Sequence, residues 1–285
     1  MALYTDVLLT VDFDRTLTAP DSTIPQRNLT AIRYFMDNGG IFTMNTGRSI
    51  PMSLRNILGI VPNNAPLLLY NGSADYDEKT GSFTRIAPLD LNPVELLPFL
   101  QERFPALNVE VQAMDAHYLM RKNTAWEEYC DHNGCPWGYA APADIPGPFI
   151  KFSFYGEFRD PTVASMYQAT EEELAQFDEM IAFMEENYGD KIEIFRACAR
   201  IADIHAKGVS KLNAARLLQK RLQKKILVCV GDAENDLTML EGADYAFCPS
   251  DGSVANQFPN VCPCAEGAVA DVIYKKIPDI LENRT

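Results

Sequence analysis

Short apolar runs of strand length alternate with amphipathic helical patterns at both ends of this chain. Val7–Val11, Ile41–Met44 and Leu67–Tyr70 are apolar runs, and between the first two Leu29 and Ile32 recur at helical spacing. Continuous apolar runs are typical of strands buried on both faces of a parallel sheet. A strand–helix–strand unit with the usual right-handed crossover places its two strands parallel in one sheet. This order of elements therefore predicts an α/β fold.

The same alternation returns near the C-terminus. Ile226–Val230 and Tyr245–Cys248 are predicted strands, and Leu237–Leu240 marks a predicted helix between them. We therefore expect residues 1–81 and 198–285 to form one Rossmann-like core, built on a doubly wound parallel sheet.

The middle of the chain, residues 82–197, follows a different pattern. Alternating polar and apolar residues predict strands of an antiparallel sheet with one packed face, at Val109–Met114, His117–Arg121, Ile150–Tyr155 and Ile192–Arg196. A helix is predicted over Thr170–Tyr188, where Thr170 and Glu173 have the spacing of a capping box. We interpret this segment as an α+β cap domain inserted into the core.

Charge limits the partners of this protein. The 285 residues contain 39 acidic and 25 basic side chains, for a formal net charge of −14. Such a surface repels nucleic acid and anionic lipid alike, so neither is an expected partner. The N-terminal stretch has acids where a signal peptide needs lysines, and seven scattered cysteines favour reduced thiols, so we expect a cytoplasmic protein.

Paired carboxylates follow two of the predicted parallel strands. Asp12 and Asp14 come after the first strand, and Asp232 and Asp236 follow Ile226–Val230. Ligands in open α/β sheets bind beyond the carboxyl ends of the strands, where these acids would meet. An all-oxygen site of this kind suits Mg²⁺.

The chain contains four ordered motifs: Asp12-x-Asp14-x-Thr16, Thr46-Gly47-Arg48, Gly208-Val209-Ser210-Lys211 and Gly231-Asp232-x-x-Asn235-Asp236. They resemble the motifs of the haloacid dehalogenase-like hydrolases, and in particular the Cof-type phosphatases with a large α/β cap. Tyr70-Asn71-Gly72, just before the expected cap, is similar to that subgroup too.

The resemblance implies a role for each matched residue. Asp12 would be the nucleophile that forms an aspartyl-phosphate, Asp14 the general acid and base, Thr46 a holder of phosphate oxygens, and Lys211 the catalytic lysine. The implied Mg²⁺ ligands are Asp12, the carbonyl of Asp14, and Asp232, with Asp236 as an occasional direct ligand. The implied substrate-binding residues are Gly47, Arg48, Asn71 and Asn235.

Two lysines compete for the catalytic position, and three segments depart from the family pattern. Ser210 is a good N-cap that would place Lys211 in the first turn of a helix, whereas Lys207 precedes it in a loop, so we favour Lys211. The departures are Arg15 in place of a frequent glycine, Leu212, and the bulky loop 246–251.

We therefore expect a Mg²⁺-dependent phosphatase that hydrolyses a small phosphomonoester, such as a sugar phosphate or a phosphorylated cofactor, as a monomer or homodimer. A phosphomutase or phosphotransferase that uses the same aspartyl-phosphate, and a non-catalytic phosphometabolite-binding protein, are the alternatives. No role is assigned to the three histidines, and metal binding by Cys130, His132 and Cys135 is not favoured. The aromatic residues of the predicted cap are expected to pack together or to contact substrate: Trp126, Tyr129, Trp137 and Tyr139.

Overall fold

A computed structural model describes residues 3–157, 159, 169–198 and 201–284 of the chain. The residues cluster into two compact units, which are described separately below. The first comprises 1–47, 59–85 and 210–285, and the second comprises 48–58 and 86–209. These limits differ from the predicted ones chiefly at 48–58 and 198–209, which cluster with the second unit.

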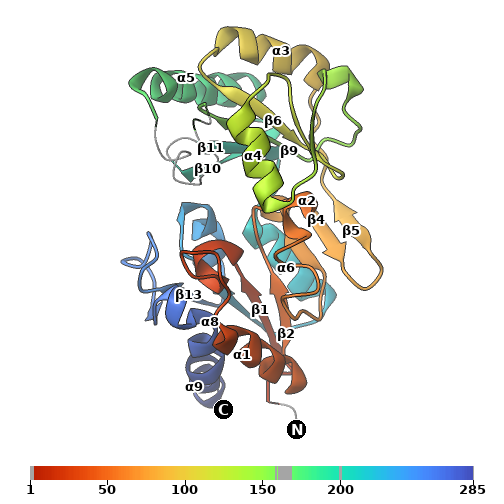
Figure 1. Cartoon of the computed structure of the whole chain (residues 1–285). Coiled ribbons are helices and arrows are strands. Elements are labelled where there is room, and N and C mark those ends of the chain that lie inside the picture. Colours follow the sequence, from red (N-terminus) through yellow and green to blue (C-terminus); the bar gives the residue numbers. More distant parts are fainter. Residues whose placement is uncertain (1–2, 158, 160–168, 199–200, 285) are drawn as a thin grey trace. The chain divides into compact units, whose positions relative to one another are not determined.

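A five-stranded parallel sheet forms the centre of the first unit (Figure 1). Its strand order is β14-β13-β12-β1-β2, and each neighbouring pair is parallel. The strands are β1 (Val7–Val11), β2 (Ile41–Met44), β12 (Ile226–Val230), β13 (Tyr245–Pro249) and β14 (Asn260–Val261). Every residue of β1 and β12 is buried, as their continuous apolar sequences predict. The predicted Rossmann-like α/β core is confirmed.

Helices complete the strand–helix–strand units of this sheet. They are α1 (Gln26–Asp37), α6 (Lys211–Arg221), α7 (Leu237–Glu241), α8 (Ala268–Asp271) and α9 (Ile277–Glu282). The apolar sides of α6 and α7 share one buried cluster with β1 and β12, which includes Leu8, Leu218, Leu227 and Met239. Helix α1 contacts α8.

The third predicted strand of the core is paired differently from the expectation. Strand β3 (Leu67–Leu69) meets the end of β2 only through a parallel bridge between Asn45 and Leu68. It belongs instead to a three-stranded sheet with β4 (Ala74–Asp77) and β5 (Ser82–Ile86), and its pairing with β4 is antiparallel. The cause is the turn that follows β3, where Tyr70 and Asn71 both have positive φ and reverse the chain.

A six-stranded sheet of order β10-β11-β9-β6-β7-β8 forms the second unit (Figure 1). Its strands are β6 (Asn108–Gln112), β7 (His117–Leu119), β8 (Trp137–Tyr139), β9 (Lys151–Tyr155), β10 (Ile192–Cys198) and β11 (Ile201–Ala206). All adjacent pairs are antiparallel except β7 with β8. The antiparallel sheet expected for the cap is confirmed.

Helices cover both faces of this sheet. They are α2 (Ile50–Ser53), α3 (Pro93–Arg103), α4 (Thr124–Asn133) and α5 (Glu171–Tyr188). One apolar cluster joins α3 and α5 to alternate residues of β6 and β9, including Val109 and Phe154. A second joins α4 to Leu119 and Tyr155, whose side chains belong to the opposite face. Helix α5 begins with the predicted capping box between Thr170 and Glu173.

Candidate active site

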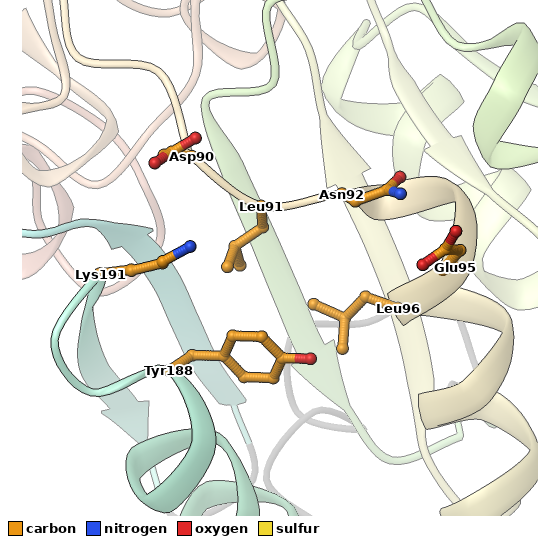
Figure 2. A pocket seen from close by; sticks show the side chains of 7 residues that line it. All are labelled: Asp90, Leu91, Asn92, Glu95, Leu96, Tyr188 and Lys191. Carbon is orange, nitrogen blue, oxygen red and sulfur yellow. The ribbon is translucent and has the colours of Figure 1, made fainter.

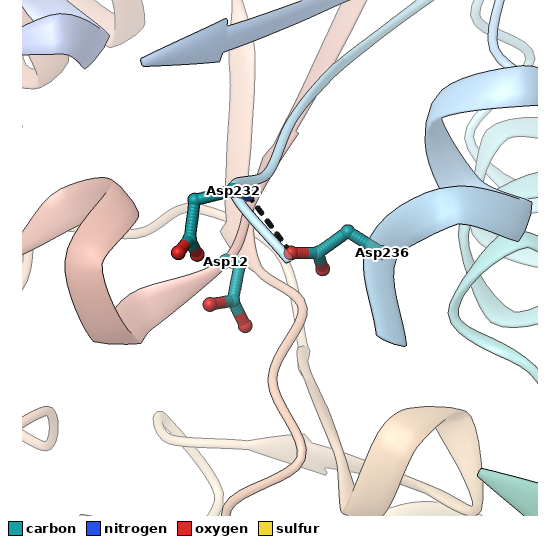
Figure 3. Close-up of side chains that lie close together, drawn as sticks. All are labelled: Asp12, Asp232 and Asp236. Carbon is teal, nitrogen blue, oxygen red and sulfur yellow. Dashed lines mark hydrogen bonds between the residues drawn. The ribbon is translucent and has the colours of Figure 1, made fainter. Parts of the chain in front are cut away.

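Three carboxylates of the first unit meet at the carboxyl ends of β1 and β12 (Figure 3). Asp12, Asp232 and Asp236 each offer an oxygen, and these oxygens lie within 4.8 Å of one another. The backbone N–H of Asp232 donates to Asp236 Oδ2 at 3.0 Å, as Figure 3 shows, which turns Asp236 toward the strand end. Gly231 permits this approach, because a Cβ there would lie 2.5 Å from Asp236 Cγ.

Lys211 supplies a buried positive charge to this cluster. Its Nζ lies 2.7 Å from Asp12 Oδ1 and 2.6 Å from Asp236 Oδ1, and its side chain is fully buried. Burial alone would lower the pKa of Lys211, but the two carboxylates outweigh it and raise that pKa above its ordinary value. Lys211 is therefore a permanent cation at neutral pH.

Negative charge still exceeds positive charge in the cluster. Burial raises the pKa of Asp12 well above its ordinary value, against the opposing effect of Lys211. Burial and the Asp236 carboxylate raise the pKa of Asp232 to about 7, although Thr16 Oγ1 donates a hydrogen bond to it at 3.0 Å. Lys211 therefore only partly offsets the unfavourable burial of these carboxylates. A hard divalent ion fits this set of oxygen donors.

The turn after β1 leaves Asp14 exposed, whereas Asp12 at the end of the strand is buried. The Asp14 carboxylate is not among the three that converge. Arg15, which occupies the position where a glycine is frequent in the family, has φ 57° and N–H donating to Thr18 Oγ1. The tight turn therefore forms without glycine, at the cost of placing a bulky residue in the left-handed region.

Thr46, Gly47 and Asn71 lie together after β2 and β3. Thr46 N–H donates to Leu68 O, and Asn71 N–H donates to Thr46 O. A Cβ on Gly47 would lie 2.8 Å from Asn71 Oδ1, so any other residue there would displace the Asn71 side chain. The neighbouring Asn45 amide donates to Lys211 O at 2.9 Å, which joins this segment to the start of α6.

Two predicted substrate-binding residues, Asn235 and Arg48, belong to different units. Asn235 is half-buried in the turn Glu234–Asp236, and Arg48 is half-buried in the second unit. Lys207, the rejected alternative to Lys211, donates to Gly189 O and pairs with Glu193.

The second unit contains buried polar residues to which sequence reasoning assigned no role. His117 and His205 are both buried, whereas His132 is exposed. Burial lowers the pKa of His205 to about 3, which keeps that ring neutral. His117 contacts Glu110 and Ser49. Only the alternation of polar residues along the strands hinted at these contacts.

Three of the aromatic residues singled out in the predicted cap pack against one another, which was the first of the two expected roles. Trp126, Trp137 and Tyr139 have ring centroids 5.7 to 6.2 Å apart. Trp137 Nε1 donates to Asp131 and Tyr139 OH to Glu127. Among the described residues, Cys130, His132 and Cys135 do not form a metal-ligand group.

A surface pocket of the second unit is shown in Figure 2. The side chains of Leu91, Leu96 and Tyr188 lie between charged groups at its rim. None of the predicted site residues lines it; its lining is Asp90, Leu91, Asn92, Glu95, Leu96, Tyr188 and Lys191.

Comparisons with known proteins agree with this geometry. A family model described as haloacid dehalogenase-like hydrolase matches residues 9–257. A haloacid dehalogenase-like hydrolase from Bacillus subtilis is similar in structure, with a TM-score of 0.76 and 18% identity over 94% of this chain and 99% of that one. A phosphatase of the same superfamily from Bacteroides thetaiotaomicron has a TM-score of 0.73 and 19% identity over 95% and 94% of the two chains.

A further similar structure is that of a subclass IIB sugar phosphatase, with a TM-score of 0.74 and 17% identity over 95% of this chain and 99% of that one. Within the described part of the chain, no helix has the length and apolar character needed to cross a membrane. The matched region contains all four motifs on which the resemblance rests. The chain belongs to the haloacid dehalogenase-like hydrolases.

Proposed function

We propose that this protein is a Mg²⁺-dependent phosphatase that hydrolyses a small phosphomonoester through an aspartyl-phosphate. The observation that carries the proposal is the contact of buried Lys211 with Asp12 and Asp236 inside a cluster of three carboxylates. A nucleophilic carboxylate must be ionised and must approach an anionic phosphate, and both require neighbouring positive charge.

The metal would be held by Asp12, the carbonyl of Asp14, and Asp232, with Asp236 beside them. When bound, Mg²⁺ would supply charge stabilisation to the phosphate oxygens in the transition state. Lys211 adds a fixed positive charge that orients Asp12 and favours its ionised form. Thr46 and the backbone around Gly47 are suited to hold phosphate oxygens, because Asn71 and Leu68 fix that segment in place.

The chemistry proceeds in two displacements at phosphorus. A carboxylate oxygen of Asp12 attacks phosphorus, and the bond to the substrate oxygen breaks as Asp14 gives that oxygen its proton. Asp14 then takes a proton from water, whose oxygen attacks the same phosphorus and releases Asp12 and inorganic phosphate. The exposed position of Asp14 suits a group that must meet both an alcohol and water.

The substrate class is a small phosphorylated metabolite, such as a sugar phosphate or a phosphorylated cofactor. The structural similarity to a subclass IIB sugar phosphatase supports a sugar phosphate as the substrate.

Release of inorganic phosphate from p-nitrophenyl phosphate tests the proposal. We expect hydrolysis that needs Mg²⁺ and falls by at least about a thousandfold in Asp12→Asn, which removes the nucleophile but keeps its size. Asp37→Asn, at the exposed end of α1, is the matched control and should retain full activity. Release of p-nitrophenol that requires an acceptor alcohol and is not matched by inorganic phosphate would indicate a phosphotransferase. Mg²⁺-dependent activity that survives Asp12→Asn would contradict the proposal.

A further inference from the structure

Three buried polar side chains form a chain of contacts within the second unit. His117 opens β7, Glu110 lies on the adjacent strand β6, and Ser49 precedes α2. His117 Nδ1 lies 2.5 Å from Glu110 Oε1, and its Nε2 lies 2.6 Å from Ser49 Oγ. Each of the three residues is less than a tenth exposed. Both ring nitrogens of His117 are thus engaged, which fixes the ring in one orientation.

The environment of His117 favours its charged form. Burial alone would lower the pKa of His117, but the charge of Glu110 and the hydrogen bond with it outweigh burial, and the pKa is raised to about 9. A charged imidazole has an N–H at both nitrogens, so it donates to Glu110 and to Ser49.

The order serine, histidine, carboxylate resembles a nucleophile with its general base, yet the contacts exclude that role. A charged imidazole cannot accept the hydroxyl proton of Ser49. Ser49 is fully buried, and its Oγ already accepts the N–H of Met52 at 3.2 Å. The hydroxyl therefore receives two hydrogen bonds and acts as a structural acceptor.

Ser49 occupies a position that links this contact chain to the predicted phosphate-binding motif. It directly follows Arg48 in the sequence Thr46-Gly47-Arg48-Ser49. Ser49 also caps α2, because its Oγ accepts from Met52 N–H and its carbonyl accepts from Ser53 N–H. Met52 in turn packs against the apolar cluster that contains Trp126. The backbone of Ser49, directly after Arg48, is therefore fixed by contacts within the second unit.

We propose that Glu110 and His117 are positioning residues for Arg48: acting through the Ser49 hydroxyl, they fix the backbone that directly follows it. The motif resemblance implies that Arg48 binds the substrate, so the catalytic consequence rests on the proposed function. The contact chain itself rests only on the distances among Glu110, His117 and Ser49.

Steady-state kinetics with p-nitrophenyl phosphate at saturating Mg²⁺ test the proposal. His117→Phe keeps a ring but removes both donors, and we expect KM to rise about tenfold while kcat changes less than about threefold, because Asp12 and Lys211 are untouched. His117→Gln keeps a donor that can reach Ser49 and should restore most of the lost affinity. Ser49→Ala should match His117→Phe, and the double variant should be no worse than either single variant.

A matched control separates positioning from general destabilisation of the second unit. Glu173 is a buried carboxylate at the start of α5, where it completes the capping box and pairs with Arg159. Glu173→Gln weakens a buried ionic contact of the same unit without touching Ser49, so its KM should stay at the wild-type value. If His117→Phe raises KM no more than Glu173→Gln does, the positioning role is refuted.

Amide hydrogen exchange tests the contact chain without any activity. We expect the amides of Met52 and Ser53 to exchange faster in His117→Phe and Ser49→Ala than in the wild type, and to be unchanged in Glu173→Gln. Unchanged exchange in His117→Phe would refute the inference even if catalysis is confirmed. Loss of the proposed function would appear instead as wild-type protein without Mg²⁺-dependent hydrolysis, while the exchange result would still stand.

Discussion

Lys211 is a fully buried cation between two carboxylates, and its removal would leave both of them without compensation. Buried ion pairs are costly to break, because the remaining charge keeps its desolvation penalty and loses its partner. The contacts with Asp12 and Asp236 therefore bear on stability as well as on catalysis.

Lys211→Met tests both effects at once. Without metal, we expect the free energy of unfolding to fall by about 3 to 5 kcal/mol, and at saturating Mg²⁺ we expect kcat to fall by at least about a hundredfold. Lys207→Met is the matched control, since Lys207 is exposed and contacts a carbonyl and Glu193. Denaturant unfolding and kinetics measure the two effects, and a severe loss in Lys207→Met alone would show that the wrong lysine was chosen.

Single residues differed in how far the sequence could predict them. Asp12 and Asp232 follow buried strands, and parallel strands bring their carboxyl ends to one edge, so their proximity could be predicted. His117 could not be placed, because its partners Glu110 and Ser49 depend on strand register and on the path of a distant segment. No local spacing encodes such contacts.

At the scale of elements, helix α6 places Lys211 by beginning at a defined residue. Ser210 is its N-cap, and the Ser210 side chain accepts the N–H of Asn213 at 3.0 Å. Because Lys211 is the first residue of the helix, the cap sets where the long lysine side chain starts.

Ser210→Ala should therefore affect both stability and catalysis. Loss of the cap is expected to cost about 1 kcal/mol, and a frayed first turn should lower kcat by about three- to tenfold. Thr170→Ala removes the equivalent cap of α5 in the second unit and should cost about as much stability with kcat unchanged. Equal kcat values in the two variants would indicate that the cap does not position Lys211.

Elements with a strong local signal were the ones that the sequence predicted well. Strands β1, β2 and β12 have the predicted limits, and α5 begins at its capping box. Strand β3 was predicted as a core strand, but the positive φ values after it send the chain back as a hairpin. Asn71-Gly72, in which Gly72 also has positive φ, is a common turn dipeptide, but the prediction used Tyr70-Asn71-Gly72 only as a family motif and not as a hairpin turn.

At the scale of the whole molecule, the net charge of −14 opposes the proposed anionic substrate. The field of the chain should repel a phosphate group at a distance, so attraction must arise locally, at Lys211 and at a bound cation. Three of the acids that contribute to the net charge are the buried carboxylates of the cluster. Metal binding is therefore expected to stabilise the fold as well as to support substrate binding.

The stabilisation by Mg²⁺ should depend on pH in a defined direction. The ordinary pKa of an aspartate is 3.8, and burial with the Asp236 charge raises the pKa of Asp232 to about 7 in the folded protein. The unfolded chain thus releases this proton at lower pH than the folded one, so the metal-free protein loses stability as pH rises through this window. Bound Mg²⁺ favours the ionised carboxylate and offsets that loss.

Calorimetry in excess Mg²⁺ and in EDTA measures this effect. We expect the Mg²⁺-dependent gain in Tm to be small near about pH 5, to increase through about pH 7 and to level off above it, as the folded carboxylates ionise. The gain should amount to a few degrees when Mg²⁺ exceeds its Kd about a hundredfold. Asp232→Asn should lose most of the gain, whereas the exposed Asp37→Asn should keep it. If the Mg²⁺-dependent gain in Tm is the same at about pH 5 as above about pH 7, the ionisation of Asp232 is not linked to metal binding.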